Sequence, residues 1–240
     1  MEILNFLDDH SRLLLGCTAH TRVTGPIVVE EFLACTPIYG VPASTLTDNG
    51  MVYTARFSGG KGGRNAFEHT LNLLGVKQKN GAPSHPQTQG KIERFHQTLK
   101  LWLAGQPAAW TLDELNTELN QFRYIYNEER PHRALNRRTP ATAYQATPKA
   151  APTLGAGQQH FRARMERIDD TGTVSLRYAG RLRHLGIGRA YKHEKVRILI
   201  KDTDALVTHH DTGEIIAEFD LDETKDYQPK KKHPDPKTGV

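Results

Sequence analysis

The apolar periodicity of this chain changes once along its length, and that change limits the folds it can adopt. In residues 1–145, apolar residues recur at helical spacing in segments that alternate with short apolar runs. In residues 160–226 the runs are short and separated by turn sequences. Residues 146–159 are small, polar and proline-bearing, which is typical of a linker. We therefore predict an α/β domain, a linker and a small all-β domain.

In the first domain, the pattern predicts strands and helices in alternation. The expected elements are a hairpin of residues 3–8 and 13–18, a helix at 24–38 capped by Thr24, a strand at 43–47, a helix near 65–75 and a strand at 76–78. The strongest helical signal follows. Ile92, Phe95, Leu99 and Trp102 form one stripe on a helix that begins after Pro86. A further helix spans about 111–126 and ends before Pro131.

The second domain shows short strands at 173–178, 196–200, 205–208 and 215–219. Several short strands at this spacing predict a small antiparallel barrel or sandwich, and we favour the barrel. The basic tail, residues 227–240, has the composition of a disordered segment.

Charge is distributed unevenly in the second domain. The chain has a formal net charge of +5, but residues 160–201 contain 11 Lys or Arg against 4 Asp or Glu, and residues 202–226 contain 1 against 9. The basic half suits a phosphate backbone. Alternatively, the two halves pair with each other across a sheet. Cys17 and Cys35 are expected to be buried free thiols, and no apolar stretch is long enough to cross a bilayer, so we expect a cytoplasmic protein.

Two acidic residues combine type and position in a way that suits a metal site. Asp48 follows a predicted strand and precedes an Asn-Gly turn, where a side chain can project at the strand end. Glu93 lies early in a predicted helix, on a different face from the apolar stripe. Carboxylates are ligands for hard cations such as Mg²⁺, and two such ions can promote phosphoryl transfer. Spacing alone leaves an alternative open, namely that the Asp48 side chain only bonds its own backbone in a turn.

Three motifs surround and follow these acids. They are Leu46-Thr47-Asp48-Asn49-Gly50, then Ser84-His85-Pro86-Gln87-Thr88-Gln89-Gly90-Lys91-Ile92-Glu93-Arg94-Phe95-His96-Gln97-Thr98-Leu99-Lys100, then Tyr126-Asn127-Glu128-Glu129-Arg130-Pro131-His132-Arg133-Ala134-Leu135. In this order they resemble the integrase-core (DDE-type) transposases of bacterial insertion sequences, relatives of retroviral integrase, over about residues 1–145. The resemblance implies a ribonuclease H-like mixed sheet with flanking helices and an Asp, Asp, Glu triad that binds two Mg²⁺ or Mn²⁺ ions. By motif, Asp48 is the second catalytic and metal-binding acid and Glu93 the third.

The first acid of that triad is not matched. In the resembled family it lies on the first, central strand, whereas Leu7-Asp8-Asp9-His10-Ser11-Arg12 resembles the end of the next strand. We therefore expect the core to be truncated at its N-terminus, with its first strand missing. We interpret Asp8 and Asp9 as turn residues, with Asp8 in the role of the first acid as the alternative. Loss of the strand would leave two unpaired sheet edges, and the fragment should be inactive or nearly so.

Basic and polar residues near Glu93 are candidates for DNA contact, with a solvated charged face as the alternative. They are Gln89, Lys91, Arg94 and Lys100. In the second domain the candidates are Arg181, Arg183, Arg189 and Lys192, with a purely structural role as the alternative. Arg130, His132 and Arg133 are expected to brace the fold, with DNA contact as the alternative. His85 and His96 are expected to be polar neighbours of the acids. The glycine-rich residues 58–63 form either an active-site flap or, as we prefer, a tolerated insertion.

Together these features predict DNA transposition or integration by metal-dependent phosphodiester cleavage and strand transfer. The expected partner is double-stranded DNA, both transposon ends and target, and the resemblance implies a homo-oligomer in the full-length family. No membrane partner and no small-molecule substrate is expected, and localisation would be cytoplasmic, associated with the nucleoid. The alternatives are a non-catalytic DNA-binding remnant of a transposase and, more weakly, a general ribonuclease H-like nuclease.

Overall fold

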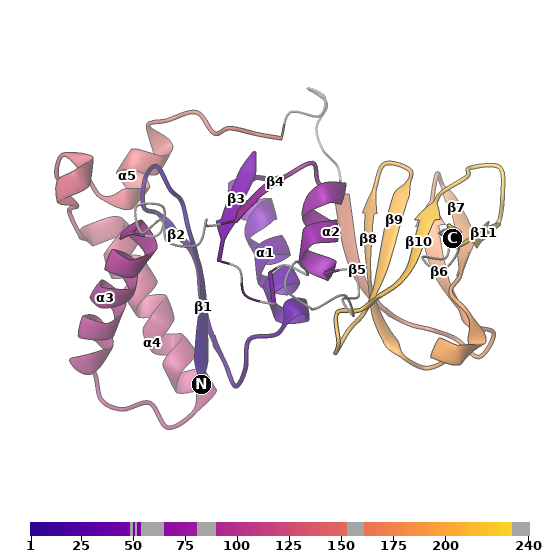
Figure 1. Ribbon diagram of the computed structural model, residues 1–240, viewed down its shortest axis with the longest axis horizontal. Coiled ribbons are helices and arrows are strands. Elements are labelled where there is room, and N and C mark those ends of the chain that lie inside the picture. Colours follow the sequence, from indigo (N-terminus) through magenta and orange to yellow (C-terminus); the bar gives the residue numbers. More distant parts are fainter. Residues whose placement is uncertain (49, 51, 54–64, 81–89, 153–160, 232–240) are drawn as a thin grey trace, which may run out of the picture.

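The computed structural model describes residues 1–48, 50, 52, 53, 65–80, 90–152 and 161–231. Along the long axis in Figure 1, the helices of residues 90–145 lie at one end, the described part of residues 1–80 lies in the middle and the C-terminal strands lie at the other end. The helices are α1 (Gly25–Tyr39), α2 (Ala66–Leu73), α3 (Gly90–Ala104), α4 (Leu112–Tyr124) and α5 (Pro140–Gln145). The strands of the first part are β1 (Glu2–Leu7), β2 (Leu14–His20), β3 (Ser44–Thr47) and β4 (Lys77–Asn80).

The β1–β2 hairpin lies at the centre of the first part, and it confirms the predicted hairpin. The strands pair antiparallel from Glu2 opposite His20 to Leu7 opposite Leu14. One face of β2 packs on the apolar stripe of α3 and on α4, while Leu4 of β1 packs with α1 and α2. Helices on both faces exclude water from the hairpin, which is the arrangement expected of an α/β layer structure.

The free edge of β2 is closed by two asparagine side chains. The Asn127 amide accepts a hydrogen bond from the Leu14 N–H (2.9 Å) and donates one to the Leu14 carbonyl (3.0 Å). Asn116 of α4 makes the same pair with Ala19, at 2.7 and 3.2 Å. A primary amide offers one acceptor and two donors, so each asparagine replaces one residue of a neighbouring strand. The N–H and carbonyl groups of Leu14 and Ala19 are thereby satisfied without another strand.

Strands β3 and β4 form a second, parallel pair, with Ser44 opposite Lys77 and Thr47 opposite Asn80. Among the residues that the structure describes, no ladder joins this pair to β1–β2. The mixed α/β character predicted for this part is confirmed, with its strands divided into two separate pairs.

The C-terminal part consists of two sheets. Its strands are β5 (Phe161–Arg167), β6 (Thr173–Tyr178), β7 (Arg181–Gly186), β8 (Lys195–Lys201), β9 (Asp204–His209), β10 (Ile215–Asp220) and β11 (Tyr227–Pro229). They form open sheets in the orders β10-β9-β8-β5 and β11-β7-β6. The two sheets share one buried core, which includes Leu176, Ile198 and Phe219. The sheets are not closed, so the predicted barrel is corrected to the open alternative that the spacing also allowed.

The end of the chain also differs from its prediction. The composition of residues 227–240 predicts disorder, but β11 pairs parallel with β7, and Gln228 is fully buried. Its amide donates to the Asp222 carbonyl (2.8 Å) and its carbonyl oxygen accepts from the Asp222 N–H (2.8 Å). These bonds tie the segment to the preceding turn. The rest of the predicted tail, residues 232–240, lies outside the described residues.

The C-terminal sheet packs against the first part. Leu199 of β8 and Leu206 of β9 belong to the same apolar cluster as α1 and α2. Arg197, 8% exposed, pairs with Glu30 of α1 at 3.1 Å. Half of the predicted linker, residues 153–159, lies outside the described residues. The two parts therefore share an apolar interface, which the linker composition of the sequence does not predict.

The sequence also makes predictions about the two cysteines and the apolar content of the helices. Both cysteines are free, Cys17 buried and Cys35 half-buried. Burial raises the pKa of Cys17 to about 12 and that of Cys35 to about 11. In the described part of the chain, no helix has the length and apolar content needed to span a membrane.

Candidate metal and nucleic-acid site

Asp48 lies directly after β3 and its side chain is exposed. Its Oδ1 accepts a hydrogen bond from the Gly50 N–H at 2.8 Å. A Cβ atom on Gly50 would lie 2.9 Å from the same oxygen, so a side chain at this position would displace the Asp48 carboxylate. The side-chain-to-backbone bond that the sequence left open as an alternative is therefore present. It uses one carboxylate oxygen, and among the described residues the other oxygen has no hydrogen bond.

Two residues that the sequence did not single out position this turn. The Gln78 amide of β4 donates to the Thr47 Oγ1 (3.2 Å) and to the Tyr53 carbonyl (2.9 Å). The Tyr53 ring packs edge-on against Phe67 of α2, with 6.1 Å between centroids. Burial, and secondarily the nearby Asp48 charge, raises the pKa of Tyr53. No motif marks Gln78 or Tyr53, because their role depends on the parallel pairing of β3 with β4.

Glu93 lies in the first turn of α3 and its side chain is exposed. Phe95 and Leu99 of the predicted stripe are buried, and Trp102 packs beside them, so the predicted apolar face is confirmed. The His96 Nε2 lies 3.2 Å from the Asn5 amide nitrogen of β1. Burial and the Lys100 charge lower the pKa of His96, while the charge of Glu93 opposes that shift. A neutral His96 that accepts from Asn5 fits the predicted role of a polar neighbour.

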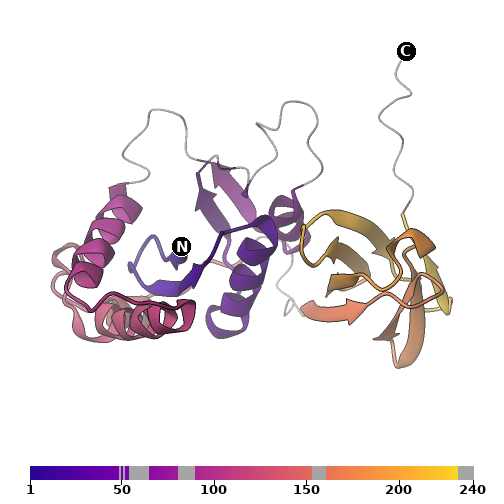
Figure 2. The same cartoon turned by 90° about the horizontal axis from the view of Figure 1, so that it is seen from below.

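The two acids lie on elements whose ends share one side of the molecule. In Figure 2, the C-terminal ends of β3 and β4 and the N-terminal end of α3 lie along the upper edge. Across the described residues, no three His, Cys, Asp or Glu side chains are grouped so that they could hold a metal ion. Convergence of the Asp48 and Glu93 carboxylates on shared ions remains a prediction.

Asp8 and Asp9 serve the β1–β2 turn, as the sequence indicated. The Asp8 Oδ2 accepts from the Ser11 N–H (2.7 Å) and from the Ser11 hydroxyl (2.6 Å). Asp9 accepts from the Lys91 ammonium at 2.7 Å. Ser11 is fully buried, so the Asp8 bonds help to close the hairpin.

The basic residues predicted around Glu93 differ in availability. Gln89 lies outside the described residues, as do His85 and residues 58–63. Lys91 pairs with Asp9, whose side chain is 78% exposed. An exposed pair of this kind contributes little stability, so DNA phosphate can compete for Lys91. Arg94 and Lys100 are exposed, and no ion pair involves either within the described residues.

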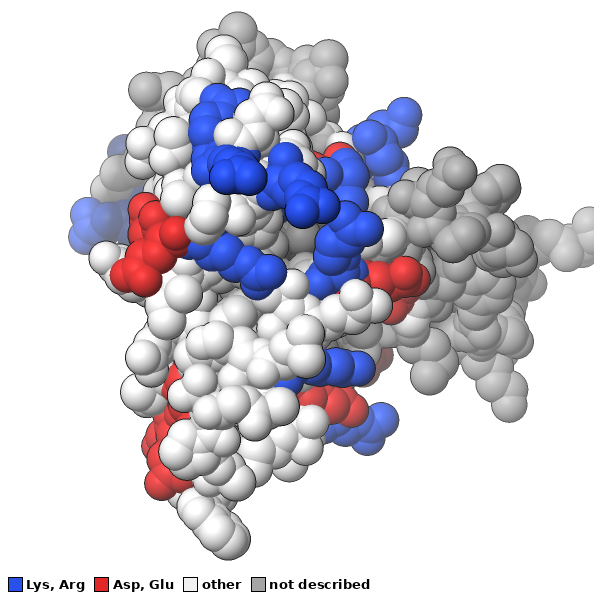
Figure 3. All heavy atoms as spheres, turned by 90° about the vertical axis from the view of Figure 1, so that its left-hand side faces the viewer, with Lys and Arg blue, Asp and Glu red and all other residues white. Residues whose placement is uncertain are grey.

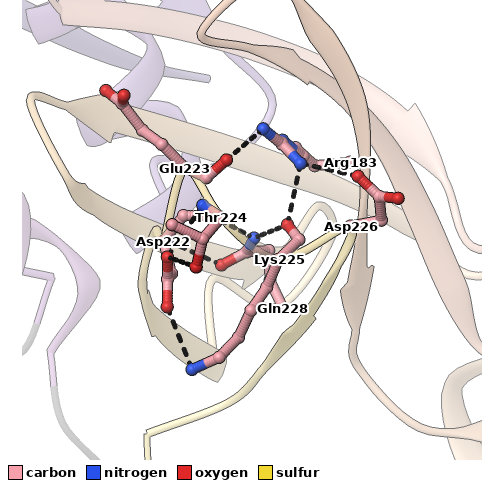
Figure 4. Close-up of polar contacts among 7 residues, drawn as sticks. All are labelled: Arg183, Asp222, Glu223, Thr224, Lys225, Asp226 and Gln228. Atoms are coloured by element: carbon pink, nitrogen blue, oxygen red, sulfur yellow. Dashed lines mark hydrogen bonds and ion pairs between the residues drawn. The ribbon is translucent and has the colours of Figure 1, made fainter.

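The basic residues predicted in the C-terminal part also differ in whether they are available to DNA. Arg181, at the start of β7, is exposed, as are Arg189 and Lys192 beyond the end of that strand. Arg183 is only 1% exposed. Figure 4 shows its guanidinium turned into the turn formed by residues 222–228.

The contacts of Arg183 explain its burial. It donates to the Asp226 carboxylate (2.6 Å) and the Lys225 carbonyl (3.1 Å), and also to the Glu223 carbonyl. These bonds attach the acidic turn to β7, so one ion pair between the basic and acidic halves is present. A guanidinium held in this way is not available to a phosphate, and Arg183 is removed from the expected DNA-binding set.

Comparison with known proteins supports the resemblance drawn from the motifs. Residues 74–140 match the family model "Integrase core domain", a segment that includes Glu93 and the motif from Tyr126 to Leu135. The chain is 27% identical over 145 residues to "Putative integrase ORF3" of Spiroplasma virus SpV1-C74, which is 58% of this chain and 40% of that protein. It is 35% identical over 94 residues to the "Gag-Pro-Pol polyprotein" of Simian retrovirus SRV-1, which is 39% of this chain and 5% of the polyprotein.

Among solved structures, the catalytic core domain of BIV integrase matches with a TM-score of 0.45 at 23% identity, over 60% of this chain and 91% of that one. The comparisons therefore relate this chain to DDE-type integrases through its sequence. Because the matched region spans well under two thirds of either viral relative, the activity and partners of those whole proteins are not transferred by the match.

Proposed function

We propose that this chain acts on double-stranded DNA in integration or transposition, by metal-dependent phosphodiester cleavage and strand transfer. The observation that carries the proposal is the integrase-core match over residues 74–140, because it contains Glu93 on the exposed face of α3. Asp48 at the end of β3 is the second acid in the proposal, and the resemblance assigns both residues to the catalytic and metal-binding triad. An origin in a bacterial insertion sequence, a ribonuclease H-like core and assembly as a homo-oligomer on DNA belong to the same proposal.

The chemistry of the two acids fits a hard divalent cation such as Mg²⁺ or Mn²⁺. Both side chains are exposed carboxylates, and the Asp48 turn leaves one oxygen free of hydrogen bonds within the described residues. A bound ion would promote attack by water or a 3′-hydroxyl on a phosphodiester. Asp48 and Glu93 would hold it, with the Gln78 and Tyr53 contacts fixing the Asp48 turn. Lys91, Arg94 and Lys100 of α3, with Gln89 before it, would hold DNA phosphates nearby.

Cleavage of the polypeptide by bound iron tests whether the two acids share an ion. Fe²⁺ in place of Mg²⁺, with ascorbate and peroxide, cuts the backbone beside its site. We expect cuts near residues 48 and 93 together, and we expect Asp48→Asn to remove both. Gly50→Ala should weaken both, because its Cβ would displace the Asp48 carboxylate. Asp113→Asn, at an exposed acid of α4, is the matched control and should leave the cuts unchanged. Cuts at one segment alone, or cuts indifferent to Asp48→Asn, would contradict a shared site.

A second candidate function is DNA binding without catalysis. It is favoured by the absence of a grouped third acid among the described residues and by the turn contacts of Asp8 and Asp9. In that case the chain binds duplex DNA but gives no product in a strand-transfer assay with Mn²⁺. Strand transfer that Asp48→Asn and Glu93→Gln both abolish supports the enzyme and contradicts binding without catalysis. Duplex binding with no strand transfer supports the binding protein.

A further inference from the structure

A second concentration of positive charge lies outside the residues proposed above. Residues 130–138, here called the arginine loop, contain four arginines and no acid: Arg130, Arg133, Arg137 and Arg138. All four are exposed, and none forms an ion pair with any described residue. Four uncompensated like charges in a short segment repel one another, so the loop is electrostatically suited to a polyanion.

The loop is held in one backbone conformation despite that repulsion. The His132 N–H donates to the Arg138 carbonyl (3.1 Å), and the Arg137 N–H donates to the His132 carbonyl (2.9 Å). Leu135 is buried beneath the loop at 8% exposure. Asn136 and Arg137 both have left-handed backbone conformations, with φ of 52° and 62°. These features fix the directions in which the arginines leave the loop, so little conformational entropy of the backbone is lost on binding.

His132 anchors the loop and does not add to its charge. Its ring contacts the Tyr126 ring edge-on, with 4.8 Å between centroids. Burial lowers the pKa of His132, and the charges of Arg130 and Arg12 lower it further, while a bond to the Tyr126 backbone opposes the shift. The lowered pKa favours the neutral imidazole, so His132 is not counted among the positive charges of the loop. The expectation that this segment braces the fold is met by His132, whereas Arg130 and Arg133 point to solvent.

The arginine loop continues the basic surface of α3. Lys91 of α3 pairs with Asp9 in the β1–β2 turn, and Arg12 of the same turn acts electrostatically on Tyr126 and His132 below the loop. Figure 3 shows Lys and Arg gathered in the upper half of the face that carries α3, α4 and α5. Glu128 and Glu129 adjoin the loop and leave residues 128–138 with a net charge of +2, from four arginines and two glutamates.

We propose that the arginine loop binds the sugar–phosphate backbone of double-stranded DNA, beyond the stretch of the duplex that lies at α3. The inference rests on the proposed DNA substrate and adds a site that the motif residues near Glu93 do not include. Guanidinium groups bind phosphate oxygens in pairs of hydrogen bonds, and the exposed part of the loop offers no large apolar side chain for a protein interface. Contacts of this kind set affinity and register and do not read base sequence.

The test measures how DNA affinity depends on salt. A double variant, Arg133→Gln with Arg137→Asn, removes two charges whose side chains make no hydrogen bond within the described chain, and asparagine tolerates the left-handed backbone at 137. The matched control, Arg22→Gln with Lys77→Gln, removes two exposed charges from elsewhere. Binding of a random-sequence duplex is followed by fluorescence anisotropy between 50 and 300 mM salt. We expect the slope of log K against log salt to fall in magnitude by about 2 in the loop variant and to stay unchanged in the control.

Three results are informative. Arg133→Lys with Arg137→Lys keeps the charge and should keep the wild-type slope, which separates charge from shape. A loop variant with the slope and affinity of the control would overturn the proposal for the loop and leave the DNA function standing. No salt-dependent duplex binding by the wild-type chain would overturn both proposals.

Discussion

Arg183 and the arginines of the 130–138 loop are the same residue type in two opposite environments. In the C-terminal sheets, the two terminal nitrogens of the Arg183 guanidinium bind two backbone carbonyls and one carboxylate, and the group is removed from solvent. In the arginine loop, four guanidinium groups project to solvent without an acidic partner among the described residues. The comparison shows that basic residues in the sequence do not always form a basic surface. The carbonyls of a neighbouring turn can bind an arginine side chain and bury it.

Replacement of Arg183 should give the largest effect, because its role is structural. Arg183→Gln removes the donor of the Glu223 carbonyl and one of the two donors of the Lys225 carbonyl, and it opens space where the guanidinium lay (Figure 4). We expect the free energy of unfolding to fall by about 2–4 kcal/mol, since buried groups lose hydrogen bonds. Urea unfolding followed by circular dichroism measures the change.

Arg181→Gln is the control for this experiment, because Arg181 lies on the same strand but is exposed. We expect its effect on unfolding to stay within about 0.5 kcal/mol. Equal stability of the two variants would mean that the burial of Arg183 is not what holds the 222–228 turn, and the comparison with the arginine loop would fail.

The anchoring of the arginine loop can be weakened without changing any charge. Asn127→Ala removes both hydrogen bonds to Leu14, a fully buried residue, from the π-helical turn Ile125–Glu129 that precedes the loop. We expect a loss of about 2 kcal/mol in unfolding free energy because the Leu14 N–H and carbonyl lose their partners. DNA affinity should also fall, although every arginine remains.

Asn120→Ala, at an exposed asparagine of α4, is the matched control and should change neither unfolding nor DNA binding. Duplex binding by Asn127→Ala equal to that of the wild type, in a temperature range where both are folded, would show that the loop does not need its anchor. It would then act as a loose cluster of charges.

The sequence predicts those parts of the fold that depend on local pattern. Strands β1, β2 and β3, helices α1 to α4 and the stripe of Phe95 and Leu99 follow from periodicity and turn residues, whereas α5 is not predicted. The sequence does not predict β7, where Leu182 is exposed and Arg183 is buried, the reverse of what their polarity indicates. The prediction for β11 is wrong, because the burial of that strand depends on a parallel contact with β7 that is distant in sequence.

In the candidate site too, the sequence predicts the residues that motifs mark and misses those that act through tertiary contacts. Asp48 and Glu93 are identified by motifs in the sequence alone, although their convergence remains to be tested. Gln78 and Tyr53 carry no such mark, since each acts through the partner strand or a ring packed across the fold. The sequence groups Arg183 with DNA-binding residues because its neighbours along the chain are basic, and only the 222–228 turn explains why it differs.

The smallest expected effect on stability concerns Asp169, an acid of the C-terminal part. The Asp169 carboxylate accepts from the Thr171 N–H (2.9 Å) and hydroxyl (2.7 Å), and from the Thr173 N–H (2.9 Å) and hydroxyl (2.7 Å). These hydrogen bonds, led by that of the Thr171 hydroxyl, hold the pKa of Asp169 well below its usual range. A depressed pKa in the folded state adds stability that is present above the unfolded value, about 3.9, and is lost as the pH falls below it.

The stability difference between the wild type and Asp169→Asn should therefore be greatest near pH 5.5 and shrink toward pH 3, as measured by urea unfolding. Asp170→Asn, an adjacent exposed acid outside this network, should show a smaller dependence over that range. A difference in unfolding free energy that did not shrink in acid would show that the Thr171 and Thr173 bonds do not stabilise the Asp169 carboxylate. Asp169 would then be available to pair with the basic half of this part.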